Sequence, residues 1–335
     1  MAEARAEAVI ERSCPLLSMA PSQSLQSASV RSAPDDGSSG SGESELSYAI
    51  CVPPLPTSHD TMPAWFQSHV SPAIVRGYRP AGQSPRFYVT SLTWLTNETI
   101  NIWSHLTGAV AFAAQLCGAA RAVDDPYLIT YRLAAFTCFA FSTAFHLLMP
   151  FSERVYVRLQ RGDFAAIFVL IGGTAIPFYS LQYDCHRDLL AAALSCTAVL
   201  TVLLAGVVGS SQAWFSKDTP RSRGLRALAF TAFAATCAGF GGASVFIGFS
   251  AAPYFEAEPA LKPALYAAIV LYIAAPVLYA AGWPEKLRPG MFDFLGASHQ
   301  WMHLCTVTAA LINSWCMERM RELRPLVASC RLAEF

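Results

Sequence analysis

The chain has 335 residues, of which 54% are hydrophobic and only 14% are charged, and its mean hydropathy is +0.37. About a quarter of an ordinary soluble chain is charged, so this composition excludes a water-soluble globular protein and predicts that most of the chain lies in lipid. Basic and acidic residues number 23 each, so the formal net charge is zero. A nucleic-acid-binding protein would carry a strongly basic stripe, and we expect no nucleic-acid partner.

Ten cysteines occur without a CxxC pair, and several lie inside apolar runs, where cysteine usually behaves as a small hydrophobic residue. We therefore expect neither a disulfide framework nor a thiolate metal site. The N-terminal stretch MAEARAEAVIERS alternates charge and has no continuous apolar core, so we expect no cleaved signal peptide and an internal segment that starts membrane insertion.

Composition divides the chain into four parts. Residues 1–60 are rich in Ser, Gly, Pro and acidic groups, which predicts a disordered N-terminal tail. Residues 61–98 are expected to form an amphipathic juxtamembrane segment, residues 99–317 a transmembrane domain, and residues 318–335 a short C-terminal tail. The transmembrane domain contains seven apolar runs, at roughly 101–120, 127–149, 163–183, 188–209, 225–249, 264–282 and 297–316.

Each run is long enough, at about 1.5 Å per residue, to cross a hydrocarbon core of about 30 Å as a helix. Lipid offers no partners to unpaired backbone groups, and the runs are too long and too uniformly apolar for barrel strands. The predicted fold is an all-α membrane protein, a bundle of seven transmembrane helices. We expect a multi-pass protein of the plasma membrane or an endomembrane.

The distribution of lysine and arginine predicts the orientation of the bundle. Twelve basic residues flank the face that carries the N-terminus, and four occupy the opposite loops, so the N-terminus is expected to be cytoplasmic. Four arginines near the C-terminus oppose this orientation, namely Arg319, Arg321, Arg324 and Arg331.

Ionisable side chains inside the predicted spans gather at one depth. His146 lies near the exit of span two, Asp163 opens span three, and His299 and His303 open span seven. Because successive spans alternate in direction, all four lie toward the cytoplasmic face. Ionisable groups within a membrane are expensive, which makes them candidates for function.

The spacing of the histidines indicates a metal site. His299 and His303 are one helical turn apart, so both imidazoles project from one helix face, and His146 completes a set of three. Three imidazole ligands leave a fourth tetrahedral position open, which is typical of catalytic zinc. Asp163 would hydrogen-bond a water on the metal or orient a histidine, and Ser142, one turn before His146, faces the same way.

Two alternatives stay open at this point. Each histidine could instead be a hydrogen-bonded core residue. In the motif NETINIWSHL, His105 could be a fourth ligand, although a supporting or packing role fits the open site better. For Glu98 we favour a structural role, as a helix-capping carboxylate or as the partner of a cytoplasmic arginine.

Several long motifs, in order, resemble the progestin and adipoQ receptors and haemolysin III proteins, especially the fungal members. The resemblance covers about residues 63–316 and rests on PAWFQS, GYRP, NETINIWSHLTGA, the Ser142 to His146 pair, RGDF and LYAAGWPEKLRPGMFDFLGASHQWMH. It implies a seven-helix fold with a cytoplasmic N-terminus and zinc held by His146, His299 and His303. It also implies that Asp163 lies near a zinc-bound water, with Ser142 beside it. The RGDF context of Asp163 departs from the family pattern.

The resemblance further implies roles in ceramide hydrolysis, in sterol or lipid signalling and, in fungi, in zinc homeostasis. One hypothesis is a zinc-dependent amide hydrolase of a ceramide-like lipid. The alternative is a non-catalytic receptor of a ceramide- or sterol-like ligand, with structural zinc. Span seven has no lysine to form a retinal Schiff base, which excludes a rhodopsin. Spans four to six have almost no ionisable interior residues, which argues against a zinc transporter.

Overall fold

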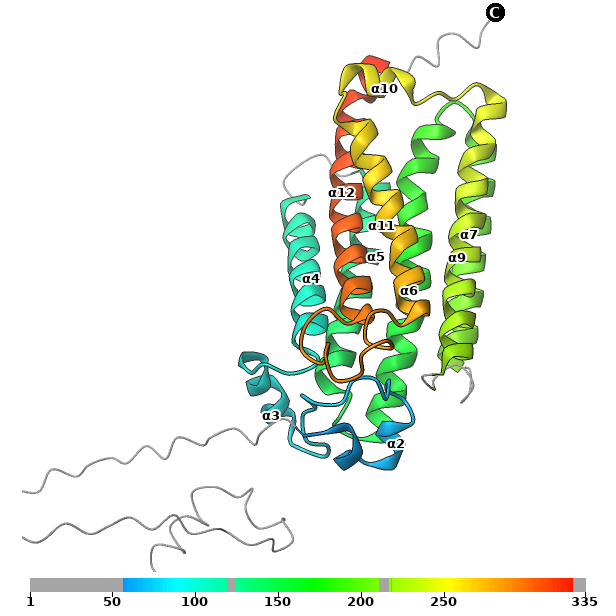
Figure 1. The fold of residues 1–335 in the computed structure, drawn as a ribbon. Coiled ribbons are helices and arrows are strands. Elements are labelled where there is room, and N and C mark those ends of the chain that lie inside the picture. The colour runs from blue at the N-terminus through cyan, green and yellow to red at the C-terminus, as the bar shows by residue number, and fades with distance from the viewer. Residues whose placement is uncertain (1–56, 120–124, 211–216, 218, 328–335) are drawn as a thin grey trace, which may run out of the picture. The chain divides into compact units, whose positions relative to one another are not determined.

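A computed structural model describes residues 57–119, 125–210, 217 and 219–327, so most of the predicted N-terminal tail lies outside it. Within these ranges, seven helices of at least 21 residues form one bundle (Figure 1). They are α4 (Thr99–Ala119), α5 (Pro126–Leu148), α6 (Glu153–Gln182), α7 (Arg187–Ser210), α9 (Pro220–Gly242), α11 (Leu261–Ala281) and α12 (Ser298–Val327).

Capping residues explain where several of these helices begin. Asp125 accepts hydrogen bonds from backbone N–H groups of the first turn of α5, and Ser152 does the same for α6. Thr219 and Ser222 form a reciprocal capping box at the start of α9, where Pro220 occupies the first turn. Gly282 caps the C-terminal end of α11. Its φ of 64° lies in the left-handed region, which residues with a side chain rarely adopt.

Two helices extend beyond the predicted spans. The helix α6 begins at Glu153, ten residues before the predicted start, so Asp163 lies well inside this helix and does not open it. The helix α12 continues to Val327, beyond the predicted end of span seven. Both extensions carry charged residues, and an apolar run cannot reveal a helix that continues past the hydrocarbon into polar surroundings.

The bundle is that of a multi-pass integral membrane protein. Among the described residues, five helices are long and apolar enough to cross a membrane: α5, α6, α7, α11, and α9 together with the adjoining 3₁₀ turn η4 (Ala243–Ile247). Large apolar side chains cover the outer face, among them Val202, which is 71% exposed. The helices α4 and α12 are not among these five, and their crossing stays a prediction.

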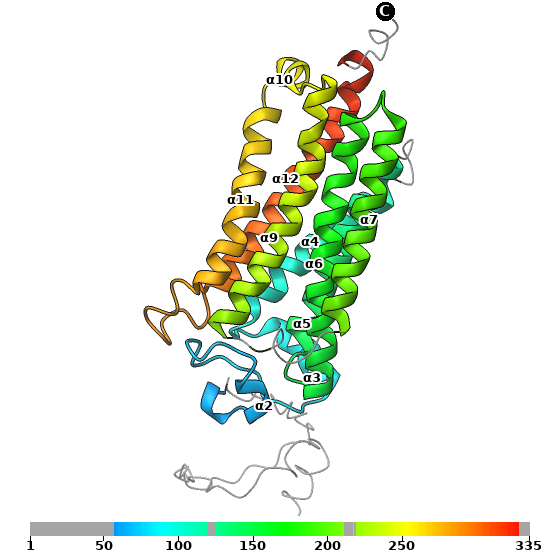
Figure 2. The ribbon, with the colours of Figure 1, turned by 90° about the vertical axis from the view of Figure 1, so that its right-hand side faces the viewer.

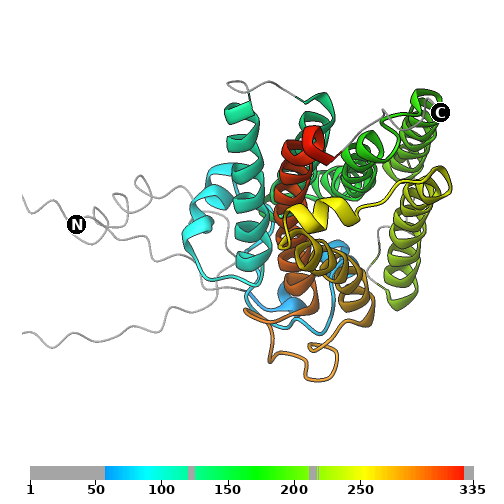
Figure 3. The ribbon, with the colours of Figure 1, turned by 90° about the horizontal axis from the view of Figure 1, so that it is seen from above.

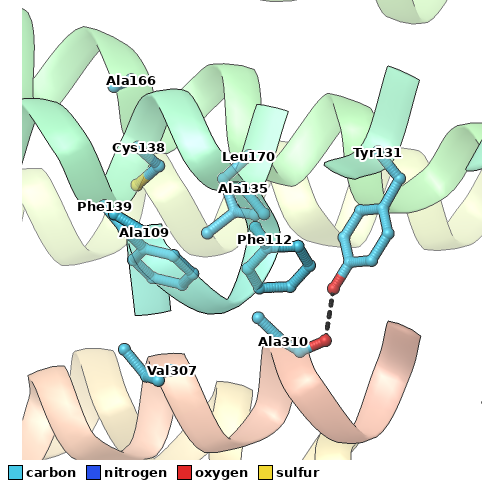
Figure 4. Packing of buried hydrophobic residues seen from close by; sticks show 10 residues of the cluster. All are labelled: Ala109, Phe112, Tyr131, Ala135, Cys138, Phe139, Ala166, Leu170, Val307 and Ala310. Carbon is cyan, nitrogen blue, oxygen red and sulfur yellow. Dashed lines mark hydrogen bonds between the residues drawn. The ribbon is translucent and has the colours of Figure 1, made fainter. Parts of the chain in front are cut away.

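Helix α12 lies on the inner side of the bundle, where it contacts α4, α5, α6 and α11 (Figure 3). A core cluster joins these helices, with Phe112 of α4 and Phe139 of α5 packed toward Val307 of α12 (Figure 4). Tyr131 of α5 donates a hydrogen bond to the carbonyl of Ala310. This cluster fixes α5 relative to α12.

Glycines let α6 approach its neighbours closely. A Cβ added to Gly173 would lie 2.4 Å from the Cβ of Ala134 on α5, and one added to Gly172 would lie 2.3 Å from Thr201 Oγ1 on α7. Small residues at helix contacts in membranes allow such approach. These two glycines therefore serve close packing.

Several short elements cover the end of the bundle at which α12 begins (Figures 1 and 2). They are η2 (His59–Thr61), α2 (Ala64–Gln67), α3 (Pro85–Thr90) and η3 (Ser91–Thr93). The segment 57–98 is tied to the loop 283–297 by Asp293, whose carboxylate accepts hydrogen bonds from the backbone N–H of Val75 and from Nε of Arg76. The two segments therefore form one cover.

Ion pairs hold the opposite end of α12, which lies near α10 (Ala252–Ala257). Arg319 pairs with Glu258 at 3.2 Å, Arg321 with Asp125 at 2.8 Å, and Arg324 with Asp184. Three of the four arginines that opposed the predicted orientation thus have structural roles. Arg331 lies outside the described residues.

Cys185, next to Asp184, is disulfide-bonded. The cysteines of the described residues found free are Cys117, Cys138, Cys196, Cys237, Cys305 and Cys316.

The orientation can be tested with tags in sealed vesicles that keep the cytoplasmic side inside. Because basic residues flank the N-terminal face, a tag placed before residue 60 should be protected from added protease, and a tag after Phe335 should be cleaved. Detergent-opened vesicles control for tag cleavage. The reverse accessibility would contradict a cytoplasmic N-terminus.

The close packing of α6 predicts unequal effects of two glycine substitutions. Gly173→Ala should destabilise the bundle by about 1–3 kcal/mol, because the new methyl group overlaps Ala134. Gly239→Ala, where an added Cβ meets no atom within 4 Å, is the matched control and should be neutral or slightly stabilising. Thermal unfolding in detergent measures both. Equal stability of the two variants would contradict the packing role.

Candidate metal centre

The last turn of α5 and the first two turns of α12 bring three histidines together. The nitrogens that His146, His299 and His303 can offer to a metal lie within 4.8 Å of one another. The Nε2 atoms of His146 and His299 are 3.3 Å apart. The three rings are inclined to one another by 45° to 77°, so they converge and do not stack.

Contacts from the loop before α12 fix the first turn of that helix. The carboxylate of Glu285 accepts hydrogen bonds from the backbone N–H of Ser298, at 2.8 Å, and from its hydroxyl. Gln300 accepts a hydrogen bond from the backbone N–H of Gly296 at 2.7 Å. These bonds hold the turn that presents His299.

Arg79, from the segment 57–98, holds the last turn of α5. Its guanidinium is buried and donates to the carbonyl oxygens of His146 and Leu147, two orphan acceptors at the end of the helix. Burial lowers the pKa of Arg79, and the nearby Glu98 carboxylate opposes that change. No sequence pattern indicated this role for Arg79.

Glu98 contacts the histidine cluster directly. Its Oε2 lies 2.7 Å from Nδ1 of His146 and accepts a hydrogen bond from the side chain of Asn101, also at 2.7 Å. Burial works to raise the pKa of Glu98, but His146, Asn101 and Arg79 outweigh it and hold this pKa at about 2. The sequence analysis favoured a structural role for Glu98 and missed its contact with a candidate ligand.

His105 lies outside the group of three. Its ring stacks on that of His303, with centroids 3.7 Å apart and planes inclined by 17°. Both of its ring nitrogens are buried without a hydrogen-bond partner among the described residues. The stacked arrangement gives His105 a packing contact with a candidate ligand.

Asp163 and Ser142 face the same region from α6 and α5. Both are buried, their side chains are hydrogen-bonded to each other, and Asp163 interacts electrostatically with His146. The unusual RGDF context has a packing role, because a Cβ at Gly162 would lie 2.7 Å from the ring of Phe141.

A cavity of about 120 Å³ is lined by His146 and His299, two of the three histidines. A buried site needs only about 10–15 Å³ of such space for one water, so this cavity is large enough for several waters or for a small polar group. It is lined by residues of the bundle and of the cover, including His146, Asp163, Arg223, Arg226, Ile74 and Tyr78.

The residues present fit a metal ion. The three histidines lie close enough to hold one, and they offer neutral nitrogen donors that suit zinc and several other transition metals. His146 and His303 are buried, and the aspartate beside them offers an oxygen. Such a set holds a metal while leaving room for a further ligand.

Comparison with known proteins agrees with these features. Residues 93–314 match the family described as haemolysin-III related. The chain belongs to this family. The match covers the helices that carry the three histidines, Asp163 and Ser142.

Family members of known name are similar over most of this chain. It is 28% identical to the adiponectin receptor protein of Drosophila melanogaster over 85% of its length and 63% of that protein's length. It is 31% identical to the ADIPOR-like receptor IZH1 of Eremothecium gossypii, over 76% and 81% of the two chains. It is 28% identical to the human membrane progestin receptor alpha, over 72% and 70%. The chain thus spans under two thirds of the Drosophila protein, and the expected resemblance is confirmed.

The three convergent histidines predict how metal content responds to substitution. His146→Ala, His299→Ala and His303→Ala should each lower the metal content of purified protein sharply, because each removes one nitrogen ligand. His105→Phe is the control, since it keeps an aromatic ring against His303 and should keep most of the metal. Elemental analysis measures the content. An equal loss in His105→Phe would show that the ligand set is different.

Proposed function

We propose that this protein is a zinc-dependent amide hydrolase that acts on a ceramide-like lipid within the membrane. The observation that carries the proposal is the convergence of His146, His299 and His303 beside the buried Asp163. Zinc suits this donor set because it is redox-inert and tetrahedral, and three histidines leave one position open. When bound there, zinc would supply Lewis-acid chemistry, polarising a carbonyl and making water a stronger acid.

The surroundings of the site suit a lipid that has a polar group at one end. The cavity reaches polar residues such as Asp163 and apolar ones such as Phe145 and Met149. Most of the outer helix surface is apolar, so an acyl chain would meet compatible surfaces in the bundle and in the bilayer. A ceramide-like amide would place its linkage near the histidines and its chains in apolar surroundings.

In the proposed reaction, water adds to the amide carbonyl carbon and the carbon–nitrogen bond then breaks. Asp163 would accept a proton from the attacking water and return it to the leaving nitrogen, so that a fatty acid and a free amine are released. Ser142 would hold the Asp163 carboxylate through their hydrogen bond. Arg226, buried beside the rings of Phe164 and Tyr279, would close one wall of the cavity.

The names of the relatives favour a second function, that of a non-catalytic receptor. Similar proteins are named as receptors of adiponectin or progestin. In this alternative, the zinc is structural, and a ceramide- or sterol-like ligand shifts the helix bundle. A receptor of this kind would need the metal for the stability of its fold, but it would not hydrolyse a lipid.

The hydrolytic proposal predicts that Asp163→Asn is folded and metallated but slow. General acid–base groups contribute about 10²–10⁴-fold to rate, and asparagine keeps the size and polarity of aspartate without its basicity. Release of fatty acid from ceramide by purified protein measures turnover, and elemental analysis measures zinc. His105→Phe should keep both activity and zinc.

Two outcomes would overturn the hydrolytic proposal. Wild-type protein loaded with zinc that releases no fatty acid from ceramide would favour the receptor function. An Asp163→Asn variant as fast as wild type would overturn the proposed mechanism, in which Asp163 transfers the proton, and would also favour the receptor function.

A further inference from the structure

We propose that Glu98 is a positioning residue that fixes which nitrogen of His146 faces the metal. This inference rests on the proposed metal site, but it does not depend on hydrolysis. Glu98, just before the first turn of α4, would thereby control a ligand on α5, 48 positions away in the sequence.

The argument begins with the two nitrogens of His146. Nδ1 lies 2.7 Å from Oε2 of Glu98, and Nε2 lies 3.3 Å from Nε2 of His299. One edge of the ring therefore faces a carboxylate, and the other edge faces the centre of the cluster. A neutral imidazole has one protonated nitrogen and one free lone pair. With the proton on Nδ1, donated to Glu98, the lone pair of Nε2 points to the metal position.

The same turn of α4 also contacts His303. Nδ1 of His303 lies 3.2 Å from the backbone carbonyl oxygen of Asn101, which can only accept a hydrogen bond. With a proton on this nitrogen, the lone pair of Nε2 of His303 is free to bind a metal. Asn101 also donates its side-chain N–H to Oε2 of Glu98. Residues 98–101 thus orient two of the three candidate ligands.

A purely structural role for Glu98 fits these contacts less well. The turn before α4 is held by Thr96 and Thr99, since Thr99 Oγ1 accepts from the backbone N–H of Thr96 and Thr96 Oγ1 accepts from that of Glu98. The hydrogen bonds of the Glu98 carboxylate go to the side chains of Asn101 and His146. This carboxylate therefore orients side chains more than it caps the helix.

The test compares zinc affinity in wild type, Glu98→Ala and Glu98→Gln, by competition with a chelator of known affinity. Mutation of a residue that hydrogen-bonds a metal ligand typically lowers the metal affinity by about 10–100-fold. Glu98→Ala should therefore bind zinc about 10–100-fold more weakly than wild type. Glu98→Gln should fall between this variant and wild type. The amide oxygen of glutamine can occupy the place of Oε2 and accept both hydrogen bonds, but it carries no charge.

A second readout separates orientation from general stability. Cobalt(II) bound in place of zinc has visible absorption bands that depend on its ligands, and these bands should change in Glu98→Ala. The matched control is Glu318→Ala, which removes a carboxylate from the buried Arg132 elsewhere in the bundle. It should lower the unfolding temperature but leave zinc affinity and the cobalt spectrum as in wild type.

Wild-type affinity and spectrum in both Glu98 variants would overturn the inference. If Glu98→Ala does not fold, the zinc affinity of Glu98→Gln is compared with that of wild type. An unchanged zinc affinity in Glu98→Gln would then overturn the inference. Wild-type protein that binds no stoichiometric zinc would overturn the metal site and this inference together. Zinc binding without ceramide turnover would end the hydrolytic proposal alone.

Discussion

The packing of α12 against α5 is the constraint on which the candidate metal centre depends. The three histidines come from these two helices, so a small shift along either one would separate their nitrogens. Phe139 and Val307 lie in the core cluster that joins the helices, and the hydrogen bond from Tyr131 to the carbonyl of Ala310 adds a directional contact. Close-packed interiors resist sliding, so the bundle can hold its ligands in place before any ion arrives.

Contacts at both ends of the bundle also help to hold α5 and α12 in place, by different means. At the end near the histidines, Arg79 and Glu285 hold single helix turns through hydrogen bonds to backbone groups. At the other end, arginines of α12 form ion pairs with carboxylates of three neighbouring segments, as in the pair of Arg324 with Asp184. Single exposed ion pairs contribute little, whereas several along one helix restrict how it can rotate.

The sequence predicted the helical class, the approximate spans and the candidate ligands because these depend on hydropathy and on depth. Depth shows that the histidines and Asp163 lie at one level, but it does not show how each helix is rotated. The contact of His146 with Glu98 therefore could not be derived. Apolar runs also missed the start of α6 at Glu153, since a helix continues outside the hydrocarbon without an apolar signal. Loop residues such as Asp293 have no periodic pattern, and only tertiary structure shows what they bind.

The position of the histidines on two distant helices has a thermodynamic consequence. An ion held by His146 and His299 would link residues 153 positions apart in the sequence, and it would bind the folded chain in preference to the unfolded one. A ligand at 100 times its dissociation constant stabilises a fold by about 2.7 kcal/mol. The free energy of unfolding of this bundle would then depend on the free concentration of the metal, so the amount of folded receptor-like protein would itself respond to metal supply.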